Sequence, residues 1–296
     1  MKVHKSKTLA QQQAVRDLAI KLKFERQLAI KMRTMFRQIS RTVKHEYLVE
    51  GRVPLQLNQF FEVDLEGILR KHYRKVAKRF NNRLKEQVIK SILPQFLEIK
   101  SSAVLEKAIN DYIILRSRLQ TEIISNTTQK EILKAYTEAA FEGQTLTREE
   151  YAEEASFAFE RRAMGRADTI GLTETQNIAE KTKDLEAQYF FAENELVAGG
   201  VAITEENAEL LKTWSAILDK VTRPTHVEAD DQTVPKDDPF IVGGAQLMFP
   251  GDTSLGAPLD EIINCRCNRS TAIRLSGLPE YVQRPESHLI PDGFAY

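Results

Sequence analysis

The chain has 296 residues, of which 42% are hydrophobic and 28% are charged, so it is long enough for one large domain or two ordinary ones with real cores. The chain contains no run of about 18 apolar residues, so we expect no transmembrane helix. The basic start is not followed by an apolar segment of the kind found in secretory signals. Two cysteines in a chain of this length argue against a disulfide-stabilised secreted protein and favour a reducing cytosol.

The formal net charge of zero hides a strong asymmetry along the chain. Residues 1–90 hold 22 Lys and Arg against 8 Asp and Glu, and the remaining residues hold 20 against 34. A basic segment of this kind is typical of contact with nucleic acid or another polyanion. Because no groove-reading motif accompanies the charge, two alternatives stay open: a solvated helix face, or pairing with the acidic part of the same chain.

The first predicted elements are two helices. Residues 8–50 contain neither Pro nor Gly and carry apolar residues at roughly helical spacing, which predicts one long helix that ends at Gly51. A second helix should begin near Asn58 or Asp64, with an apolar stripe at steps of three and four: Leu65, Leu69, Tyr73, Val76, Phe80, Leu84 and Val88. Basic residues cover much of its remaining surface and are the candidates for DNA contact: Arg70, Lys71, Arg74, Lys75, Lys78, Arg79 and Arg83.

The middle of the chain also reads as helix, interrupted at several positions. One helix is expected over residues 101–124, and Asn126-Thr127-Thr128 is the expected cap of the next, which should end near Gly143.

Thr147 and Glu150 form a T-x-x-E capping box that predicts the start of a further helix, extending to about Met164. After Gly171 the helical pattern is expected to resume over Leu172–Leu196.

From about Lys212 the pattern changes to short strands and turns, because five prolines recur at intervals too short for a long helix. Lys212–Leu218 predicts a strand that carries Trp214, and Phe240–Val242 and Gln246–Phe249 predict two short strands around a tight turn. Ile262–Asn268 predicts one more strand.

These elements predict a mainly α protein with long N-terminal helices and a small C-terminal α+β module that contains a short antiparallel sheet. The expected segments are a basic helical arm at 1–100, a helical middle domain at 101–205, the α+β module at 206–275 and an extended tail at 276–296.

The module also carries the residues best suited to metal binding. Cys265 and Cys267 lie two apart, so in a strand their side chains would point the same way, and His226 is the third ligand candidate. A water or one nearby carboxylate would complete an acceptable tetrahedral zinc set, the candidates being Asp219, Asp230, Asp231 and Asp252. The alternative is a tight core with two small buried thiols and with His226 bonded to a backbone carbonyl, and it predicts no cofactor. A disulfide between the two thiols would close a strained ring and is not expected.

The same residues would suit a thiol hydrolase, with Cys265 as nucleophile, His226 as base and Asp219 as orienting group. However, no nucleophile elbow, Gly-rich phosphate loop or H-E-x-x-H motif accompanies them, so we do not expect an enzyme.

Several of the module's residues suggest structural roles. An ion pair between Asp219 and Arg223 is expected to hold the turn that Pro224 begins. Gly251, in the sequence P-G-D, suits a type II turn because glycine tolerates a positive φ. Trp214 is expected to anchor the core with its indole N–H hydrogen-bonded.

Taken in order, these motifs carry a resemblance to a known family. The module contains Trp214, Asp219, Arg223-Pro224-Thr225-His226, Pro250-Gly251-Asp252 and Asn264-Cys265-Arg266-Cys267. Upstream, Arg166–Glu174 fits the pattern R-A-x-x-I-x-x-T-E, with Gly171 in place of the usual Ala. Over about residues 125–270 the chain resembles the minor head proteins of tailed bacteriophages, the Mu F-like head morphogenesis family.

The resemblance implies a structural component of the virion head, present in the host cytoplasm during assembly. It implies docking on the portal protein, with the scaffold protein, the major capsid protein and packaged DNA as further candidate partners. The expected role is to assist head assembly or the packaging and delivery of DNA. No catalytic residue is carried over from the family. Two alternatives unrelated to phage heads are a Cys/His-dependent hydrolase and a zinc-stabilised adaptor.

Overall fold

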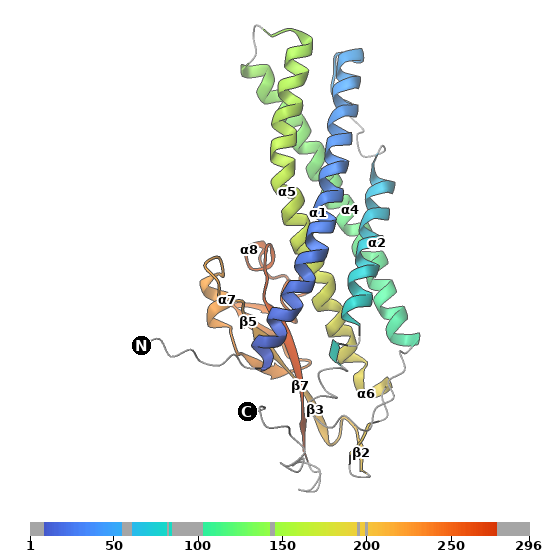
Figure 1. Cartoon of the computed structure of the whole chain (residues 1–296), viewed down its shortest axis with the longest axis vertical. Coiled ribbons are helices and arrows are strands. Elements are labelled where there is room, and N and C mark those ends of the chain that lie inside the picture. The colour runs from blue at the N-terminus through green and yellow to red at the C-terminus, as the bar shows by residue number, and fades with distance from the viewer. Residues whose placement is uncertain are drawn as a thin grey trace. The chain divides into compact units, whose positions relative to one another are not determined.

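The computed structural model describes most of the chain, namely residues 9–54, 61–81, 83–84, 103–142, 146–193, 196–198 and 201–276. It has the predicted fold class, with long helices first and a small antiparallel sheet toward the C-terminal end (Figure 1). Backbone contacts divide the chain into two compact units. The sheet unit comprises Met1–Ala19, Ala77–Ile109 and Ala179–Tyr296, and the bundle unit comprises Ile20–Val76 and Asn110–Ile178. Each unit therefore draws on more than one of the segments expected from the sequence.

The bundle unit is built from parts of four helices: α1 (Leu9–Glu50), α2 (Glu62–Phe80), α4 (Ala103–Glu142) and α5 (Arg148–Gln188). Within it the helices run alongside one another in alternating directions (Figure 1). Ion pairs between α1 and α5 show the antiparallel register, since Arg33 meets Asp168 and Lys44 meets Glu153. Among the described residues, no helix combines the length and the apolar character needed to cross a membrane.

The first helix agrees with the sequence pattern, whereas α2 begins at Glu62, between the two predicted starts, and ends at Phe80, before the predicted stripe does. α1 ends directly before Gly51, whose φ of 75° no other residue type adopts so readily. The apolar stripe of the second helix is buried at every described position, namely Leu65, Leu69, Tyr73, Val76, Phe80 and Leu84, while Val88 lies outside the described residues. A stripe at helical spacing thus predicts the packed face correctly.

The predicted break at residues 126–128 is wrong, because α4 continues through it to Glu142. Thr127 and Thr128 do not cap a new helix. Instead their hydroxyls donate to carbonyls one turn earlier in the same helix, over 2.8 Å to Ile123 and 2.6 Å to Ile124. A threonine whose hydroxyl donates to a carbonyl of the preceding turn can lie in the interior of a helix.

The predicted capping box is confirmed. The Thr147 backbone N–H and hydroxyl donate to the Glu150 carboxylate over 2.9 and 2.8 Å, and the Glu150 N–H donates to the Thr147 hydroxyl over 3.3 Å. The predicted interruption at Gly171 is wrong, because α5 passes through this residue without a break. A Cβ on Gly171 would lie 2.7 Å from the Glu25 carbonyl oxygen, so the glycine allows α1 and α5 to approach closely.

The helix expected to reach Leu196 is also shorter than predicted. α5 ends at Gln188 and is followed by the short α6 (Phe190–Glu193) and by β1 (Leu196–Ala198). Phe190, the first residue of α6, is buried in an apolar cluster with Ile203 and Leu210.

The main sheet of the sheet unit has three antiparallel strands in the order β4-β3-β7, which span Thr233–Pro235, Ala208–Ser215 and Asn268–Leu275. Trp214 of the central strand pairs with Arg269. Two small hairpins pair β1 with β2 (Val201–Ile203), and β5 (Phe240–Val242) with β6 (Ala245–Leu247). The two strands predicted around a tight turn are therefore present, although the second spans Ala245–Leu247 and not Gln246–Phe249. The strand that carries Trp214 is also present, but it spans Ala208–Ser215 and not Lys212–Leu218.

The strand predicted at Ile262–Asn268 is wrong. This segment begins with the end of the one-turn helix α8 (Leu259–Ile262) and continues as a loop, and β7 starts only at Asn268. Asn264 has a φ of 59°, a left-handed conformation that a continuous strand does not accommodate. Cys265 and Cys267 accordingly lie in the loop before β7.

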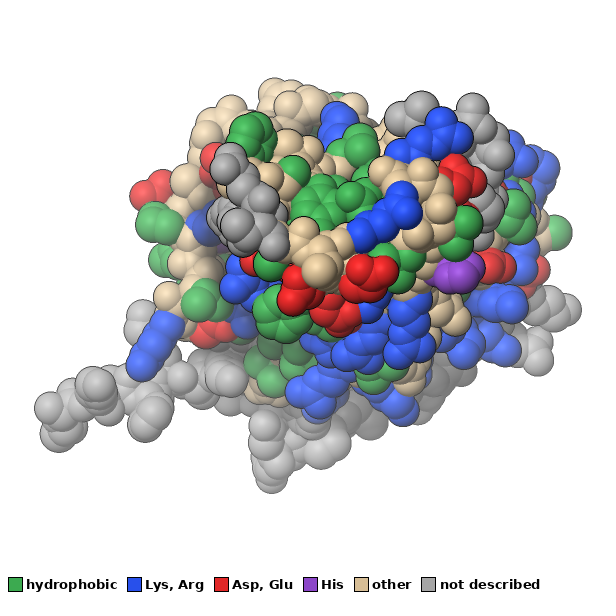
Figure 2. Space-filling model, turned by 90° about the horizontal axis from the view of Figure 1, so that it is seen from above, with side chains coloured by type: hydrophobic (Ala, Val, Ile, Leu, Met, Phe, Trp, Pro, Cys, Tyr) green, Lys and Arg blue, Asp and Glu red, His purple; other side chains and the backbone are tan. Residues whose placement is uncertain are grey.

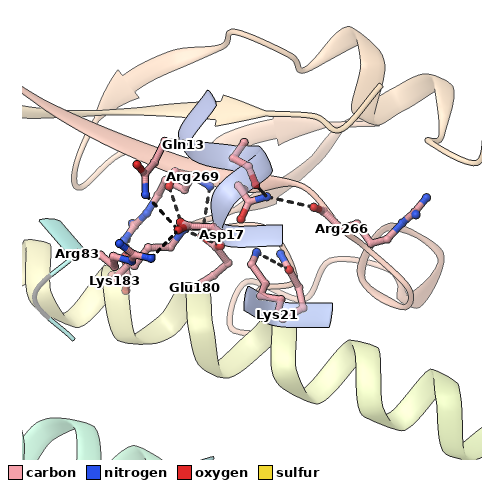
Figure 3. A network of polar contacts seen from close by, with 12 residues as sticks. Gln13, Asp17, Lys21, Arg83, Glu180, Lys183, Arg266 and Arg269 are labelled. Atoms are coloured by element: carbon pink, nitrogen blue, oxygen red, sulfur yellow. Dashed lines mark hydrogen bonds and ion pairs between the residues drawn. The ribbon is translucent and has the colours of Figure 1, made fainter. Parts of the chain in front are cut away.

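A buried ionic network joins four parts of the sheet unit, namely the start of α1, the segment around Arg83, the end of α5 and β7 (Figure 3). Asp17 of α1 lies 3.5 Å from Arg83 and 3.4 Å from Lys183, which also meets Glu180 at 2.7 Å. Arg269 of β7 meets Asp184 of α5 at 2.9 Å.

Asp17, Glu180 and Asp184 thus each lie against at least one cation, so none of these three buried carboxylates lacks a partner of opposite charge. Burial alone would raise the pKa of Asp184, but the neighbouring Arg269 and Lys181 outweigh burial and hold this pKa below its usual value.

Candidate functional site

The motif residues of the C-terminal module gather around one buried core. Trp214 is fully buried, and its ring makes edge contacts with His226 at 5.5 Å and with Phe240 at 5.4 Å between centroids. The rest of this core is Ala216, Ala229, Val242, Leu247, Cys265 and Cys267. Trp214 is thus the predicted core anchor. Its indole N–H has no hydrogen-bond partner among the described residues, contrary to prediction, because mostly apolar side chains enclose it.

The R-P-T-H turn and the residues just before it lie against the segment that holds the N-C-R-C motif. The turn forms the short helix α7 (Pro224–Glu228), with Pro224 at its first position, where proline is favoured. The Arg223 guanidinium donates to the Ile263 carbonyl, and Asp219 meets Arg266 at 2.7 Å.

The predicted ion pair between Asp219 and Arg223 is therefore wrong, because Arg223 reaches the Ile263 carbonyl and Asp219 pairs with Arg266 instead. Burial favours a higher pKa for Asp219, but hydrogen bonds from the Val221 N–H and from Thr222, together with the charge of Arg266, lower it.

The P-G-D turn is stabilised by a buried carboxylate. Gly251 has a φ of 87°, as the predicted turn requires. Asp252 is 2% exposed and accepts hydrogen bonds of 2.9 Å from the backbone N–H groups of Met248 and Ser254. Asp252 therefore fixes this turn rather than contributing to a metal site.

His226, Cys265 and Cys267 come together as predicted. The His226 Nδ1 atom lies 3.3 Å from the Cys267 sulfur and 3.7 Å from the Cys265 sulfur, and these three donor atoms lie within 4.8 Å of one another. Neither cysteine is part of a disulfide, and all three side chains are buried.

The other nitrogen of His226 meets a residue that the sequence did not reveal. Nε2 lies 2.9 Å from the Glu261 carboxylate of α8, so the expected bond to a backbone carbonyl is wrong. The Thr225 hydroxyl also donates to this carboxylate over 2.9 Å. None of the four candidate aspartates supplies the carboxylate. Glu261 could have been suspected only from its position shortly before the C-x-C pair.

The histidine and the thiols affect each other's protonation. Burial alone would lower the pKa of His226, but the adjacent Cys265 outweighs it and raises this pKa. The hydrogen bond from Cys267, and then that from His226, lowers the pKa of Cys265 against the effect of burial. A cavity of about 10 Å³, roughly the size of one water, lies beside this group. The chemistry open to the group is thus that of a thiolate beside an imidazolium, or of a metal ligand set.

The upstream motif belongs to the bundle unit and serves its packing. Arg166 of α5 donates to the Thr128 hydroxyl and to the Ile124 carbonyl of α4, each over 2.8 Å. Burial is the main cause that lowers the pKa of Arg166 to about 10. Glu174, at the other end of the motif, accepts two hydrogen bonds of 3.0 and 2.9 Å from Arg116 and one of 2.6 Å from Tyr73.

The basic candidates along and just after α2 fall into two groups. Lys71, Arg74, Lys75, Lys78 and Arg79 are exposed and have no ion pair within the described part of the chain. Arg70 and Arg83 instead pair with Glu66 and Asp17. On the face seen in Figure 2, Lys and Arg side chains gather in one area with a smaller group of Asp and Glu next to it. We therefore retain the five exposed cations as the candidates for DNA contact.

Comparison of the chain with protein-family models, with curated protein sequences and with solved structures found no match. The resemblance to phage head morphogenesis proteins therefore remains a prediction that rests on the motifs.

Proposed function

We propose that this chain is a minor head protein of a tailed bacteriophage, a structural component that docks on the portal protein. It would assist head assembly or the packaging and delivery of DNA. The observation that carries the proposal is the ordered series of motifs from Trp214 to Cys267. The structure supports a common purpose for these motifs, because Asp219 pairs with Arg266, Arg223 reaches Ile263, and His226 lies against both thiols.

The contacts of the motif residues favour docking over turnover. Trp214, His226 and Cys265 are at most 2% exposed, and the adjacent cavity of about 10 Å³ has no room for a substrate. In the bundle unit, Arg166 and Glu174 likewise bond to neighbouring helices. The motifs thus maintain the shape of two folded units, which is what a protein that acts by binding requires.

Portal binding is tested with the full chain and the portal protein encoded nearest to it in its genome. We expect the two to co-sediment after co-expression, and a portal protein from an unrelated tailed phage to leave this chain in the supernatant. A portal gene just upstream and a scaffold or capsid gene downstream would support the same conclusion. Normal, infectious particles that lack the polypeptide would contradict the proposal.

DNA contact is tested separately with two variants of equal charge change. One replaces the five exposed cations of α2 with Gln. The other replaces five exposed cations on other elements, namely Lys107, Lys130, Lys134, Arg161 and Lys220. If α2 contacts phosphates, the first variant should bind duplex DNA more weakly and with a shallower salt dependence, while the second should resemble the unmodified protein. An equal loss in both variants, or no binding by the unmodified chain, would exclude a specific role for α2.

One observation favours a second function, a Cys/His-dependent hydrolase. The Cys265 sulfur lies 3.7 Å from His226, and its pKa is lowered, as in an activated thiol. This alternative predicts that Cys265→Ser abolishes turnover of a thioester or ester substrate while the melting temperature stays the same. The structural role predicts the reverse, with a lower melting temperature and poorer incorporation into heads.

A further inference from the structure

The three donor atoms of the buried cluster have the spacing of a zinc site. A tetrahedral zinc ion holds sulfur at about 2.3 Å and nitrogen at about 2.0–2.1 Å, which places a nitrogen and a sulfur about 3.5 Å apart. The two distances from His226 Nδ1, 3.3 Å to the Cys267 sulfur and 3.7 Å to the Cys265 sulfur, lie on either side of this value. Donors from α7 and from the loop before β7 therefore need little movement to share one ion.

The remaining nitrogen of His226 has the contact expected for a metal-bound histidine. Its Nε2 lies 2.9 Å from the Glu261 carboxylate, which is oriented in turn by the Thr225 hydroxyl. A carboxylate on one ring nitrogen fixes the proton there and leaves the lone pair of the other nitrogen for a metal. In this tautomer the free lone pair is on Nδ1, the atom that faces both sulfurs.

Charge and space also suit a bound zinc ion. Two thiolates and a neutral imidazole cancel the two positive charges of zinc, so the buried centre would carry no net charge. The adjacent cavity of about 10 Å³ is lined in part by His226, Cys265 and Cys267, and it can take one water as the fourth ligand. A substrate does not fit there, so the ion would stabilise the module by joining α7 to the loop before β7.

We infer that His226, Cys265 and Cys267 bind one zinc ion, with Glu261 as the positioning residue that holds the imidazole and a water at the fourth position. The centre stabilises the C-terminal module and takes no part in turnover. It goes beyond the proposed head function, which assigns no metal to the chain.

The test uses the full chain, purified under reducing conditions, with Zn²⁺ and Co²⁺ as probes. We expect about one zinc per chain after dialysis against Zn²⁺. In the cobalt form we expect the visible bands of a tetrahedral ion together with thiolate charge-transfer bands. Removal of zinc by a strong chelator should lower the midpoint of the unfolding transition that Trp214 fluorescence reports, and added Zn²⁺ should restore it.

Variants locate the site and separate metal loss from poor folding. Cys267→Ser should lose the stoichiometric zinc, whereas Val242→Ala, which weakens the same core without touching a donor, should keep it. Glu261→Gln should still saturate with zinc but bind it about 10–100-fold more weakly.

Two results would overturn the inference. One is less than a tenth of an equivalent of zinc in the reduced, folded protein, with no cobalt spectrum and no effect of chelation on the transition. The other is full zinc content in both Cys265→Ser and Cys267→Ser, because zinc would then be bound elsewhere.

Discussion

The bundle unit and the C-terminal module of the sheet unit bury their polar groups in different ways. In the bundle, the Glu174 carboxylate meets the Arg116 guanidinium at 2.9 Å, and both side chains are at most 6% exposed, so one charge cancels the other. In the module, the donor atoms of His226, Cys265 and Cys267 lie within 4.8 Å of one another, and the other nitrogen of His226 lies 2.9 Å from the Glu261 carboxylate. Ion pairs between helices thus balance the buried charges of the first region, whereas in the second a histidine lies within hydrogen-bonding distance of two thiols and a carboxylate.

The chain offers a simple way to observe the two regions separately. Trp214 is the only tryptophan and lies in the core of the module, so its fluorescence reports the unfolding of that region. Far-UV circular dichroism is dominated by the long helices, most of whose length lies in the bundle unit. Urea denaturation followed by both signals can therefore assign the effect of each substitution to one region.

The largest effect is expected from Glu174→Ala in the bundle. This substitution leaves the Arg116 charge buried without its partner, which should lower the free energy of unfolding by about 3–5 kcal/mol. The dichroism transition should move more than the fluorescence transition. The control is Asp168→Ala, which removes a 59% exposed carboxylate paired with Arg33 and should cost less than about 1 kcal/mol. Equal losses in the two variants would contradict the view that burial makes the Glu174 pair important.

In the module, Asp252→Ala should produce the next largest effect. The buried carboxylate accepts hydrogen bonds from two backbone N–H groups, and its loss leaves the Met248 N–H without this partner. We expect a loss of about 2–3 kcal/mol, seen mainly in the Trp214 transition. Asp260→Ala, at an exposed position of α8, should change that transition by less than about 0.5 kcal/mol. If the dichroism transition moves by the same amount, the two units unfold together.

The bundle should also respond to pH through His72. Burial, and then the charges of Lys31 and Lys75, lower the pKa of His72 from 6.5 to about 3. Between these values the unfolded chain takes up a proton that the folded chain does not, so stability falls as the pH falls. We expect the free energy of unfolding to be about 2 kcal/mol lower at pH 5 than at pH 7 from this group alone.

The dichroism transition, measured in urea at both pH values, checks this expectation. His72→Gln keeps a polar side chain near Thr175 but cannot titrate, so its stability should depend less on pH by the same amount. An unchanged pH dependence in this variant would assign the effect to another group.

The sequence predicted most of the helical fold because its signals are local. The glycine after α1, the capping box at Thr147 and the apolar stripe of α2 each act within a few residues. The break predicted near Thr128 was wrong for a reason that composition does not reveal, because the hydroxyl bonds back to its own helix. From the sequence alone, a threonine is compatible with a helix cap and with a helix interior.

The candidate site was predicted in part. The sequence singled out His226, Cys265 and Cys267, and the structure brings their donor atoms together. It did not reveal Glu261, because a one-turn helix has no periodicity and the meeting with His226 depends on how α7 and α8 pack. For the same reason Asp219 was assigned to the nearby Arg223, although it pairs with Arg266 on a distant segment.

The smallest predicted effect concerns two glycines of α5, Gly165 and Gly171. It tests whether Gly171 is required for the close packing of α1 against α5. A Cβ on Gly171 would lie 2.7 Å from the Glu25 carbonyl oxygen and 3.3 Å from Ala29, whereas a Cβ on Gly165 would have no neighbour within 4 Å. Alanine is favoured over glycine inside a helix, so Gly165→Ala should raise the free energy of unfolding by about 0.5–1 kcal/mol.

Gly171→Ala gains the same helix preference but must push α1 away from α5, and overpacking of this kind costs about 1–3 kcal/mol. The net result should be a loss of about 1 kcal/mol in the dichroism transition, opposite in sign to the effect of Gly165→Ala. If both substitutions stabilise the bundle, the close approach of the two helices at Gly171 is not required for packing. If both destabilise it, the helix preference of alanine does not decide the outcome at either position. Opposite signs would show that Gly171 serves the packing of α1 against α5, although from the sequence alone it resembles a helix break.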